Sequence, residues 1–248
     1  MIRLLTTAAL IAVTSTTALA SDVILAPESV GESGGKFYVA ARAGGVFLQD
    51  TTFGLDAAAA VPTDIVNGYD DAGFVGGAAV GYDFEMRSGF SLRGEVEVGF
   101  FNAGIESHTV TALDATLSGD DAFGTTRVTY GMASAAVDVD AGFFSPYVSA
   151  GIGIANVNFD NHGIVVDTAT STASGLPVGD VTALDDNATA FAYQIGAGVG
   201  FDVTDRVTLE LGYRFFGVEN VQLTAVDGTE SSVDLDAHQG LVGMRFSF

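Results

Sequence analysis

The sequence predicts an all-β protein: an eight-stranded antiparallel up-and-down transmembrane β-barrel with short periplasmic turns and long extracellular loops. Three observations carry this prediction. Apolar and polar side chains alternate over segments of about a dozen residues, which indicates strands long enough to cross a bilayer at a tilt. The connections between these segments are alternately long and short. Within each segment, the ionisable residues fall on the face opposite the large apolar residues, as expected where one face meets lipid and the other a lumen.

The composition requires apolar and acidic residues to occupy separate surfaces. The 248-residue chain has a formal charge of -22, 32 glycines, no cysteine and no tryptophan, yet its mean hydropathy is positive, +0.38. The absence of cysteine excludes disulfides and thiolate metal sites, and the negative charge opposes binding of nucleic acid. The body of the chain has no apolar run of about 18 residues, so no spanning helix is predicted.

The N-terminus is typical of an exported protein. A basic start at Arg3, an apolar core and the small-x-small site Ala18-Leu19-Ala20 predict a signal peptide over residues 1–20, cleaved before Ser21. We expect a periplasmic leader over residues 21–35 and the barrel domain over residues 36–248. A short N-terminal helix that stays attached is the alternative.

The stretch Thr189–Val218 shows the alternation most clearly. Its two arms place large apolar residues at odd positions, and only Thr204, Asp205 and Arg206 separate them. The other strands are expected at Lys36–Leu48, Gly73–Glu85, Phe90–Ala103, Arg127–Ala141, Pro146–Asn158 and His238–Phe248. The expected long loops are Gln49–Ala72, Gly104–Thr126, Phe159–Ala188 and Glu219–Ala237. The sheet must close, because lipid offers no partner to an open edge. A soluble β-sandwich is the alternative, but it does not need strands this long.

Eight strands enclose an interior that side chains just fill. Charge on the lipid face costs roughly 2 to 4 kcal/mol near the midplane, so we expect the ionisable strand residues to line the lumen. The expected lumen charge network consists of Arg42, Arg93, Glu95, Glu97, Asp138, Glu210, Arg214 and Arg245. Because a buried unpaired charge costs several kcal/mol, these groups should pair and plug the lumen. Asp83 and Asp202 share this face, so some carboxyls should be protonated or reach water. A narrow cation-preferring pore is the alternative.

Three segments resemble those of a known family. The closing Met244–Phe248, with its aromatic Phe246 and Phe248, resembles the C-terminal signal by which bacterial outer-membrane barrels are recognised for insertion. Pro146–Phe159 and Phe191–Phe216 resemble the hairpins of small outer-membrane protein A-like, or porin family, barrels. The resemblance implies a multi-pass protein of the outer membrane of a Gram-negative bacterium, with a structural or surface-interaction role. It implies outer-membrane lipid, lipopolysaccharide and the barrel-assembly machinery as partners. We expect no periplasmic peptidoglycan-binding domain, because the sequence ends at Phe248.

The four expected loops are strongly acidic. They carry 19 Asp and Glu, and their only neighbouring cation is Arg127. Among these acids are Asp50, Asp56, Asp64, Asp70, Asp71, Asp120, Asp121, Asp185 and Asp186. We expect a solvated surface that repels like-charged partners. Weak binding of divalent cations, which prefer oxygen ligands, is the alternative, although no stretch has the spacing of a calcium loop.

The sequence does not favour catalysis or a cofactor. Some small outer-membrane barrels are lipid-modifying enzymes that place a serine beside a histidine, but His108, His162 and His238 form no His-x-Ser pair and lack metal-ligand spacing. The Gly-x-Gly-x-Gly run at residues 196–200 lies inside a strand and precedes no helix, so it is not a dinucleotide site. We expect these glycines to make room for lumen side chains. The hypothesis from sequence is therefore a non-enzymatic barrel without a cofactor.

Overall fold

The computed structural model describes residues 35–55, 63–69, 72–86, 89–105, 107–112, 115–119, 122–168, 171–172, 177–226 and 228–248. The expected signal peptide, and all of the expected leader except Gly35, lie outside these residues. Within these ranges, no helix is long and apolar enough to cross a membrane.

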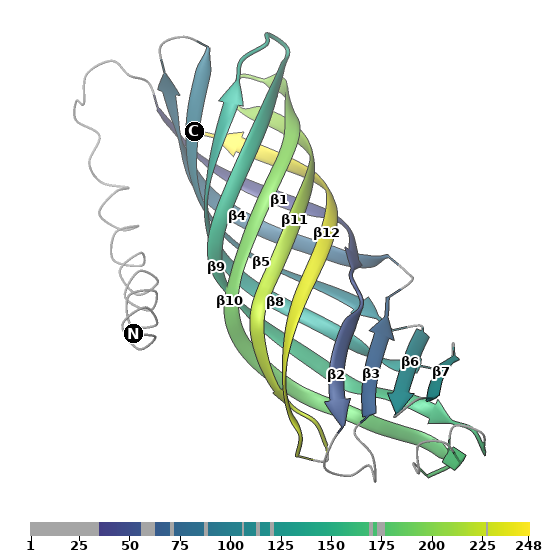
Figure 1. Ribbon diagram of the computed structural model, residues 1–248. Helices are drawn as coiled ribbons and strands as arrows, with labels where there is room; N and C mark the ends of the chain where they lie inside the picture. The colour runs from purple at the N-terminus through teal and green to yellow at the C-terminus, as the bar shows by residue number, and fades with distance from the viewer. Residues whose placement is uncertain are drawn as a thin grey trace, which may run out of the picture. The chain divides into compact units, whose positions relative to one another are not determined.

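Eight of the described strands form a closed antiparallel barrel (Figure 1). Their bounds are β1 Lys36–Leu48, β4 Gly73–Met86, β5 Phe90–Gly104, β8 Ala122–Val139, β9 Phe144–Val166, β10 Gly179–Thr204, β11 Val207–Thr224 and β12 Glu230–Ser247. Around the wall they follow the order β1-β12-β11-β10-β9-β8-β5-β4, and β4 pairs with β1 to close the ring. The predicted fold class is confirmed.

Large apolar side chains cover the outer wall of the barrel. Exposed residues of this kind lie on all eight strands, among them Phe37, Val80, Val98, Val137, Ile152, Ile195, Leu211 and Val242. A soluble protein rarely exposes so continuous an apolar surface, so this band is the lipid-facing belt that the alternation predicts. The short turns lie at one end of the belt. We name the opposite end, where the strands continue, the extracellular end.

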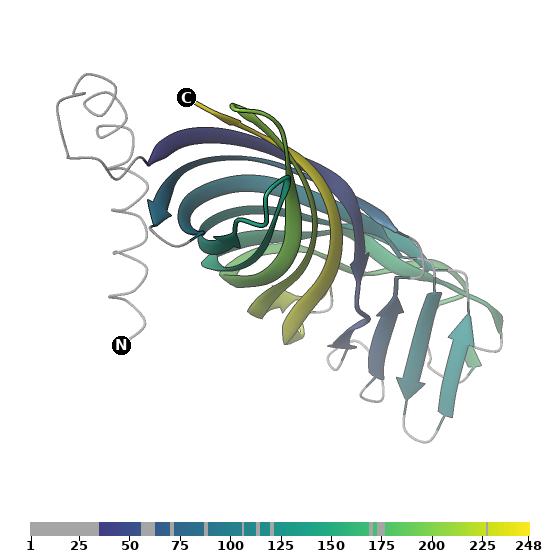
Figure 2. The same ribbon diagram turned by 90° about the horizontal axis from the view of Figure 1, so that it is seen from above.

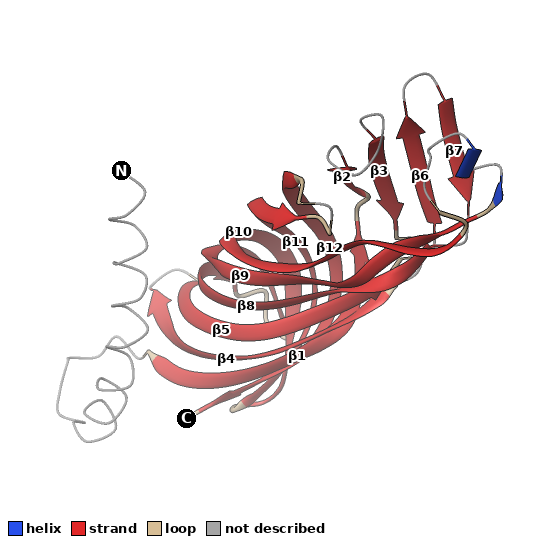
Figure 3. Cartoon of the chain, turned by 90° about the horizontal axis from the view of Figure 1, so that it is seen from below, coloured by secondary structure: helices blue, strands red, loops and turns tan. Residues whose placement is uncertain are grey.

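The predicted strand bounds at this end are too short, because most residues of the four expected loops are in strands. Loops Phe159–Ala188 and Glu219–Ala237 largely continue the barrel wall, so that β9 has 23 residues and β10 has 26. Four further strands come from the other two loops: β2 Thr51–Leu55, β3 Thr63–Gly68, β6 Ser107–Ala112 and β7 Ala115–Gly119. They form a second sheet in the order β2-β3-β6-β7, which lies at the extracellular end of the barrel (Figures 2 and 3).

In the continued parts of the barrel strands, acidic residues mark the outer face of a strand rather than a loop. On β12, Val233, Leu235 and Ala237 are buried, whereas Asp234 is exposed and Asp236 is half-buried. The alternation is the same as in the lipid-facing part of the strand, but water replaces lipid outside, so aspartate replaces valine or phenylalanine. A search for apolar outward residues therefore ends each strand too early.

Two bulges also hide the continuation of β9 and β11. Asn161 and Asn220 have positive φ angles, 53° and 55°, a conformation that asparagine tolerates better than most residues. Before Asn220 the inward residues of β11 are even-numbered, as at Val218, and after it they are odd-numbered, as at Val221. The period-2 pattern thus changes phase inside one strand, at the register shift between β11 and β12.

We expect Asp234→Ala to loosen the β11 bulge. Asp234 Oδ1 accepts a hydrogen bond of 2.8 Å from the backbone N–H of Asn220, a group that the bulge removes from the ladder. Loss of such a bond should lower local stability by about 1 kcal/mol. Amide hydrogen exchange beyond residue 218 on β11 should become about fivefold faster. Glu230→Ala is the control, because Glu230 is an exposed acid at the start of β12, the strand that also carries Asp234. An equal change in both variants would contradict the expected role of Asp234.

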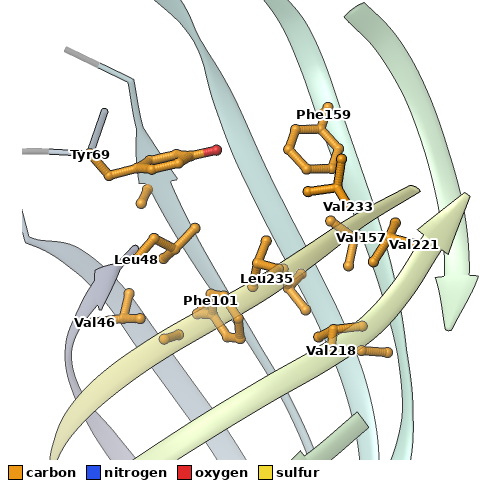
Figure 4. Close-up of a cluster of buried hydrophobic side chains, with 14 of the residues drawn as sticks. Val46, Leu48, Tyr69, Phe101, Val157, Phe159, Val218, Val221, Val233 and Leu235 are labelled. Carbon is orange, nitrogen blue, oxygen red and sulfur yellow. The ribbon is translucent and has the colours of Figure 1, made fainter. Parts of the chain in front are cut away.

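The extracellular half of the barrel interior holds an apolar core. Its buried members come from all eight barrel strands and from β3, and they include Val46, Leu48, Ile65, Val75, Phe101, Val128, Val157, Phe159, Leu184, Phe216, Val218 and Leu235. Several of these side chains converge in Figure 4. The alternation predicts an inner face of small or ionisable residues, but only part of the inner face has this composition. It is polar at the periplasmic half and apolar at the extracellular half.

Candidate functional site: the barrel interior

The eight side chains of the expected charge network come together inside the periplasmic half of the barrel. Arg42, Arg93, Glu95, Glu97, Asp138, Glu210, Arg214 and Arg245 are connected by ion pairs that join β1, β5, β8, β11 and β12. All are largely shielded from solvent, down to an exposed fraction of 1% for Glu97 and 3% for Arg93. Successive side chains of a strand point to opposite faces. Because the apolar residues of each strand face the lipid, the charged residues that alternate with them face the lumen.

Glu210 is the centre of the network. Its Oε1 accepts a hydrogen bond of 2.8 Å from Arg93 Nη1, and its Oε2 accepts one of 3.2 Å from Arg42 Nε. Arg245 Nε lies 3.8 Å from Oε1. Arg93 continues the network to Asp138, whose Oδ2 accepts a bond of 2.7 Å from Arg93 Nε. One carboxylate thus compensates three guanidinium groups that come from different strands.

Arg42 and Arg214 bind the two glutamates of β5. Arg42 holds Glu95 with two parallel bonds of 2.6 and 2.7 Å, the bidentate geometry that suits guanidinium and carboxylate. It also donates to Glu97 Oε2 at 3.0 Å. Arg214 donates to the other oxygen of Glu97, to the hydroxyl of Tyr130 and to Gln239 Oε1, each at 2.8 Å. The four arginines therefore face four carboxylates in one connected cluster.

The two remaining lumen carboxyls of the sequence analysis are peripheral. Asp202 is exposed near the short-turn end, and its Oδ1 accepts a bond of 2.6 Å from the hydroxyl of Thr208. Asp83 is half-buried, and its Oδ1 has no hydrogen-bond partner among the described residues. The surplus of carboxyl groups thus lies outside the paired cluster rather than within it.

The inward glycines of β10 and β11 leave space for Tyr147. A Cβ atom on Gly198 or Gly212 would come within 2.6 Å of the Tyr147 hydroxyl oxygen, so any larger residue there would displace this ring. The Arg93 guanidinium carbon lies 5.0 Å from the centre of the same ring, which is within cation–π distance. The glycine run therefore does what the sequence analysis expects of it, making room for a lumen side chain.

An aromatic layer covers the charge network on its extracellular side. The rings of Phe101, Tyr130 and Phe216, from β5, β8 and β11, lie 4.9 to 6.3 Å apart between centroids. All three are buried, and the Tyr130 hydroxyl donates to Glu97 Oε1 at 2.8 Å. The sequence analysis missed this layer, because it assigned large apolar residues to the lipid face. The signal was present, since Phe101 and Phe216 fall out of phase with the apolar residues of their own strands.

A cavity of about 40 Å³ remains within the network, lined by residues that include Arg42, Arg93, Tyr147 and Gln194. A water molecule needs about 10 to 15 Å³ of such space, so the cavity accommodates about three. Gln194 Oε1 is buried without a hydrogen-bond partner among the described residues, and a water in this cavity could satisfy it.

The acidic extracellular surface offers no preformed metal site in the described part of the chain. No group of three or more His, Asp or Glu side chains is placed there to hold an ion. Asp186 instead accepts backbone hydrogen bonds of 2.8 Å from Asn187 and Thr224, and Asp160 pairs with Arg127 at 3.1 Å. Asp56, Asp70, Asp71, Asp120 and Asp121 lie outside the described residues, as does the side chain of Asp64.

The three histidines occupy unrelated positions. His238 lies on the outer wall, where its Nδ1 is 2.6 Å from the hydroxyl of Tyr213 and its Nε2 is 3.1 Å from Gln49 Nε2. His162 is buried at the extracellular end. His108 lies on β6, and its side chain is outside the described residues. The expectation that this chain is not an enzyme stays a prediction.

Comparison with known proteins finds a family model and several similar proteins. A family model described as "Outer membrane protein beta-barrel domain" matches residues 6–246. An uncharacterized protein of Brucella abortus is 29% identical over 184 residues, 69% of this chain, and the chain spans only 62% of that relative's length. Outer membrane protein PagN of Salmonella typhimurium is 26% identical over 202 residues, which cover 75% of this chain and 76% of PagN. The solved structure of Neisserial surface protein A is similar with a TM-score of 0.46 and 19% identity, over 87% of this chain and 99% of that one.

The C-terminal residue is held at the end of the barrel wall. Phe248 is exposed at the end of the wall, and its backbone N–H donates to Phe37 O at 2.9 Å across the seam where β1 pairs with β12. With the closed eight-stranded wall, the apolar belt and a family match over nearly its whole length, the chain belongs to the outer membrane β-barrel protein family and is a protein of the bacterial cell outer membrane.

Proposed function

We propose that this protein has a structural and surface-interaction role: a non-conducting barrel that holds a folded, acidic β-structure on the outside of the cell. The observation that carries the proposal is the double filling of the interior, by paired charges in the periplasmic half and by an apolar core in the extracellular half. Ions that pass the first layer meet the second, where side chains such as Val157 and Phe216 have no exposed surface. Dehydrating an ion in such a layer is very costly.

The extracellular part supports the second half of the proposal. Strands of up to 26 residues extend well beyond the 9 to 11 residues or so that a bilayer requires, and the second sheet adds to this structure. The outward residues include exposed acids such as Asp180, Asp185 and Glu219. A surface of this kind suits partners that carry positive charge, because it repels anionic ones. Lipopolysaccharide phosphate is anionic and would require divalent cations to bridge it to these acids. We therefore propose lipopolysaccharide and divalent cations as partners that bind together.

Insertion into the outer membrane is proposed to use the C-terminal signal. Phe246 lies on the lipid face and Phe248 is exposed at the end of the barrel wall, so neither aromatic ring is buried in the barrel interior. We propose the outer-membrane barrel-assembly machinery as the partner that reads them.

A conductance measurement tests the closed barrel. The mature protein, refolded into a planar bilayer at neutral pH, should give no steady openings, because the cavity of about 40 Å³ cannot hold a continuous water path. The shift in gel mobility between unheated and heated samples verifies folding, and a porin of known conductance in the same membrane verifies sensitivity. Steady cation-selective openings from folded protein would overturn the proposal and favour a narrow diffusion pore.

A further inference from the structure

We propose that the second sheet is held on the barrel by a pH-sensitive latch that opens in mild acid. The latch is a buried, hydrogen-bonded set of five side chains: Thr51, Asn67, Tyr69, Thr126 and His162. Three of them belong to the second sheet or to the residue directly after it, and two belong to barrel strands. Two of these bonds, Asn67–His162 and Tyr69–Thr126, are therefore made across the junction between the two sheets.

His162 is at the centre of the latch. Its Nδ1 lies 3.2 Å from the amide nitrogen of Asn67 on β3, and its Nε2 lies 3.2 Å from the hydroxyl of Thr126 on β8. The Thr126 hydroxyl lies 2.7 Å from that of Tyr69, which is 3.5 Å from that of Thr51 on β2. In Figure 4 the Tyr69 ring extends from the backbone just after β3 toward the other drawn side chains.

The surroundings of His162 are apolar and closely packed. The side chain has no exposed surface, and the Phe159 ring contacts it at 5.0 Å between centroids. Gly124 on β8, with φ of 134°, approaches the ring so closely that a Cβ there would lie 2.8 Å from it. The bulge at Asn161 turns His162 inward, because it changes the phase of β9 just before it. This is why His162 does not follow the outward pattern of its neighbours.

The hydrogen bonds require a neutral imidazole. An amide nitrogen can only donate, so Asn67 donates to Nδ1, and Nε2–H donates to the Thr126 hydroxyl oxygen. Protonation would place a second N–H at Nδ1, opposite the amide donor, and would leave a positive charge in the core. In the docked state the protonated ring would lose the hydrogen bond from Asn67 and would have no water around it. In the undocked state water would solvate the protonated ring.

Two groups partly offset this cost. A hydrogen bond with the Thr125 backbone and the negative charge of Asp160 both favour the protonated ring, but Asp160 is paired with Arg127 of β8 at 3.1 Å. On the side of the second sheet, the nearest titratable groups are the Tyr69 hydroxyl of the latch itself and Asp50, which acts on Tyr69. Burial therefore lowers the pKa of His162 from its ordinary 6.5 to about 4.

The direction of the pH effect follows from this shift. Docking is favoured fully well above pH 6.5, where both states are neutral, and it weakens as the pH falls toward 4, because only the undocked state binds the proton. From the two pKa values, the ratio of docked to undocked molecules should fall about 30-fold between pH 7.5 and pH 5. Undocking would also withdraw Ile65 of β3 from the apolar core in the extracellular half of the barrel.

Spin-label distances test the latch. The chain has no cysteine, so Val66→Cys on β3 and Asp205→Cys in the turn before β11 give two unique labels. We expect one narrow distance distribution at pH 7.5 that broadens reversibly by pH 5. His162→Gln keeps an acceptor and a donor but does not titrate, and it should stay narrow at pH 5. His238→Gln, on the outer wall, should respond like the parent protein.

Two outcomes would overturn the proposal. One is a parent protein whose distribution stays narrow down to pH 4.5, and the other is a His162→Gln variant that opens with the parent's pH dependence. A second measurement covers the case in which His162→Gln does not dock at neutral pH. Nitrogen NMR of the parent's histidines should find the His162 ring neutral in the docked form at pH 5.5, and a protonated ring in a docked sheet would also overturn the latch.

Discussion

Replacing Glu210 by alanine is expected to lower the free energy of unfolding of the barrel by about 3 to 5 kcal/mol. Removing one partner of a buried ion pair costs about this much, because the other charge remains buried without compensation. Here the loss falls on Arg42 and Arg93 together, since both guanidinium groups donate to this carboxylate, and Arg245 lies beside it. Four lumen arginines would then face three carboxylates.

Unfolding by urea in lipid vesicles measures this effect. Because the chain has no tryptophan, the gel-mobility shift of the folded barrel is a suitable signal. Asp160→Ala is the control, since it breaks the Arg127–Asp160 pair, whose side chains are 60% and 46% exposed. That change should cost less than about 1 kcal/mol. If both variants lost the same small amount, the lumen cluster would not stabilise the barrel as argued.

Replacing Phe216 by alanine should also cost about 3 to 5 kcal/mol, through a different mechanism. The ring is fully buried and contacts the rings of Phe101 and Tyr130 at 5.4 and 4.9 Å. Its removal loses the apolar transfer energy and leaves a cavity that the surrounding wall cannot collapse to fill. The strands are fixed by their pairing with neighbours on both sides, so little relaxation is available.

A lipid-facing phenylalanine provides the matched comparison. Phe100 neighbours Phe101 on β5 but points outward and is about half exposed to the membrane, at 48%. Phe100→Ala loses only the transfer energy, because acyl chains close over the vacated space. The same urea titration should therefore find a clearly larger loss for Phe216→Ala. Equal losses would mean that the interior repacks as freely as the lipid does.

The membrane part of the fold could be predicted from the sequence because two constraints act there at once. Lipid requires large apolar residues outside, and the narrow lumen requires small or paired polar residues inside, so the phase of each strand is fixed by residues such as Glu97 and Val98. β1 begins and ends at the predicted residues, Lys36 and Leu48. The grouping of lumen charges was also predictable, since inward ionisable residues of a closed ring must meet.

The extracellular part could not be predicted in the same way. Water outside removes the requirement for apolar outward residues, and positive-φ residues at Asn161 and Asn220 change the phase within a strand. The strands of the second sheet are five or six residues long, too short for alternation to be distinctive. The specific pairing within the lumen also depends on register: Glu97 binds Arg214, 117 positions away in the sequence, and no local pattern specifies that partner.

The alternation along the β12 extension has a consequence for how such a surface evolves. Val233 and Leu235 belong to the core, whereas Ser232 and Glu230 face water. Outward positions of this kind contribute no packing, so they can exchange charge, size and hydrogen-bonding groups freely, with Asp234 as an exception because it supports the β11 bulge. The water-facing surface of this extension can thus diversify at every second residue, with no insertion, no deletion and no change to the framework beneath it.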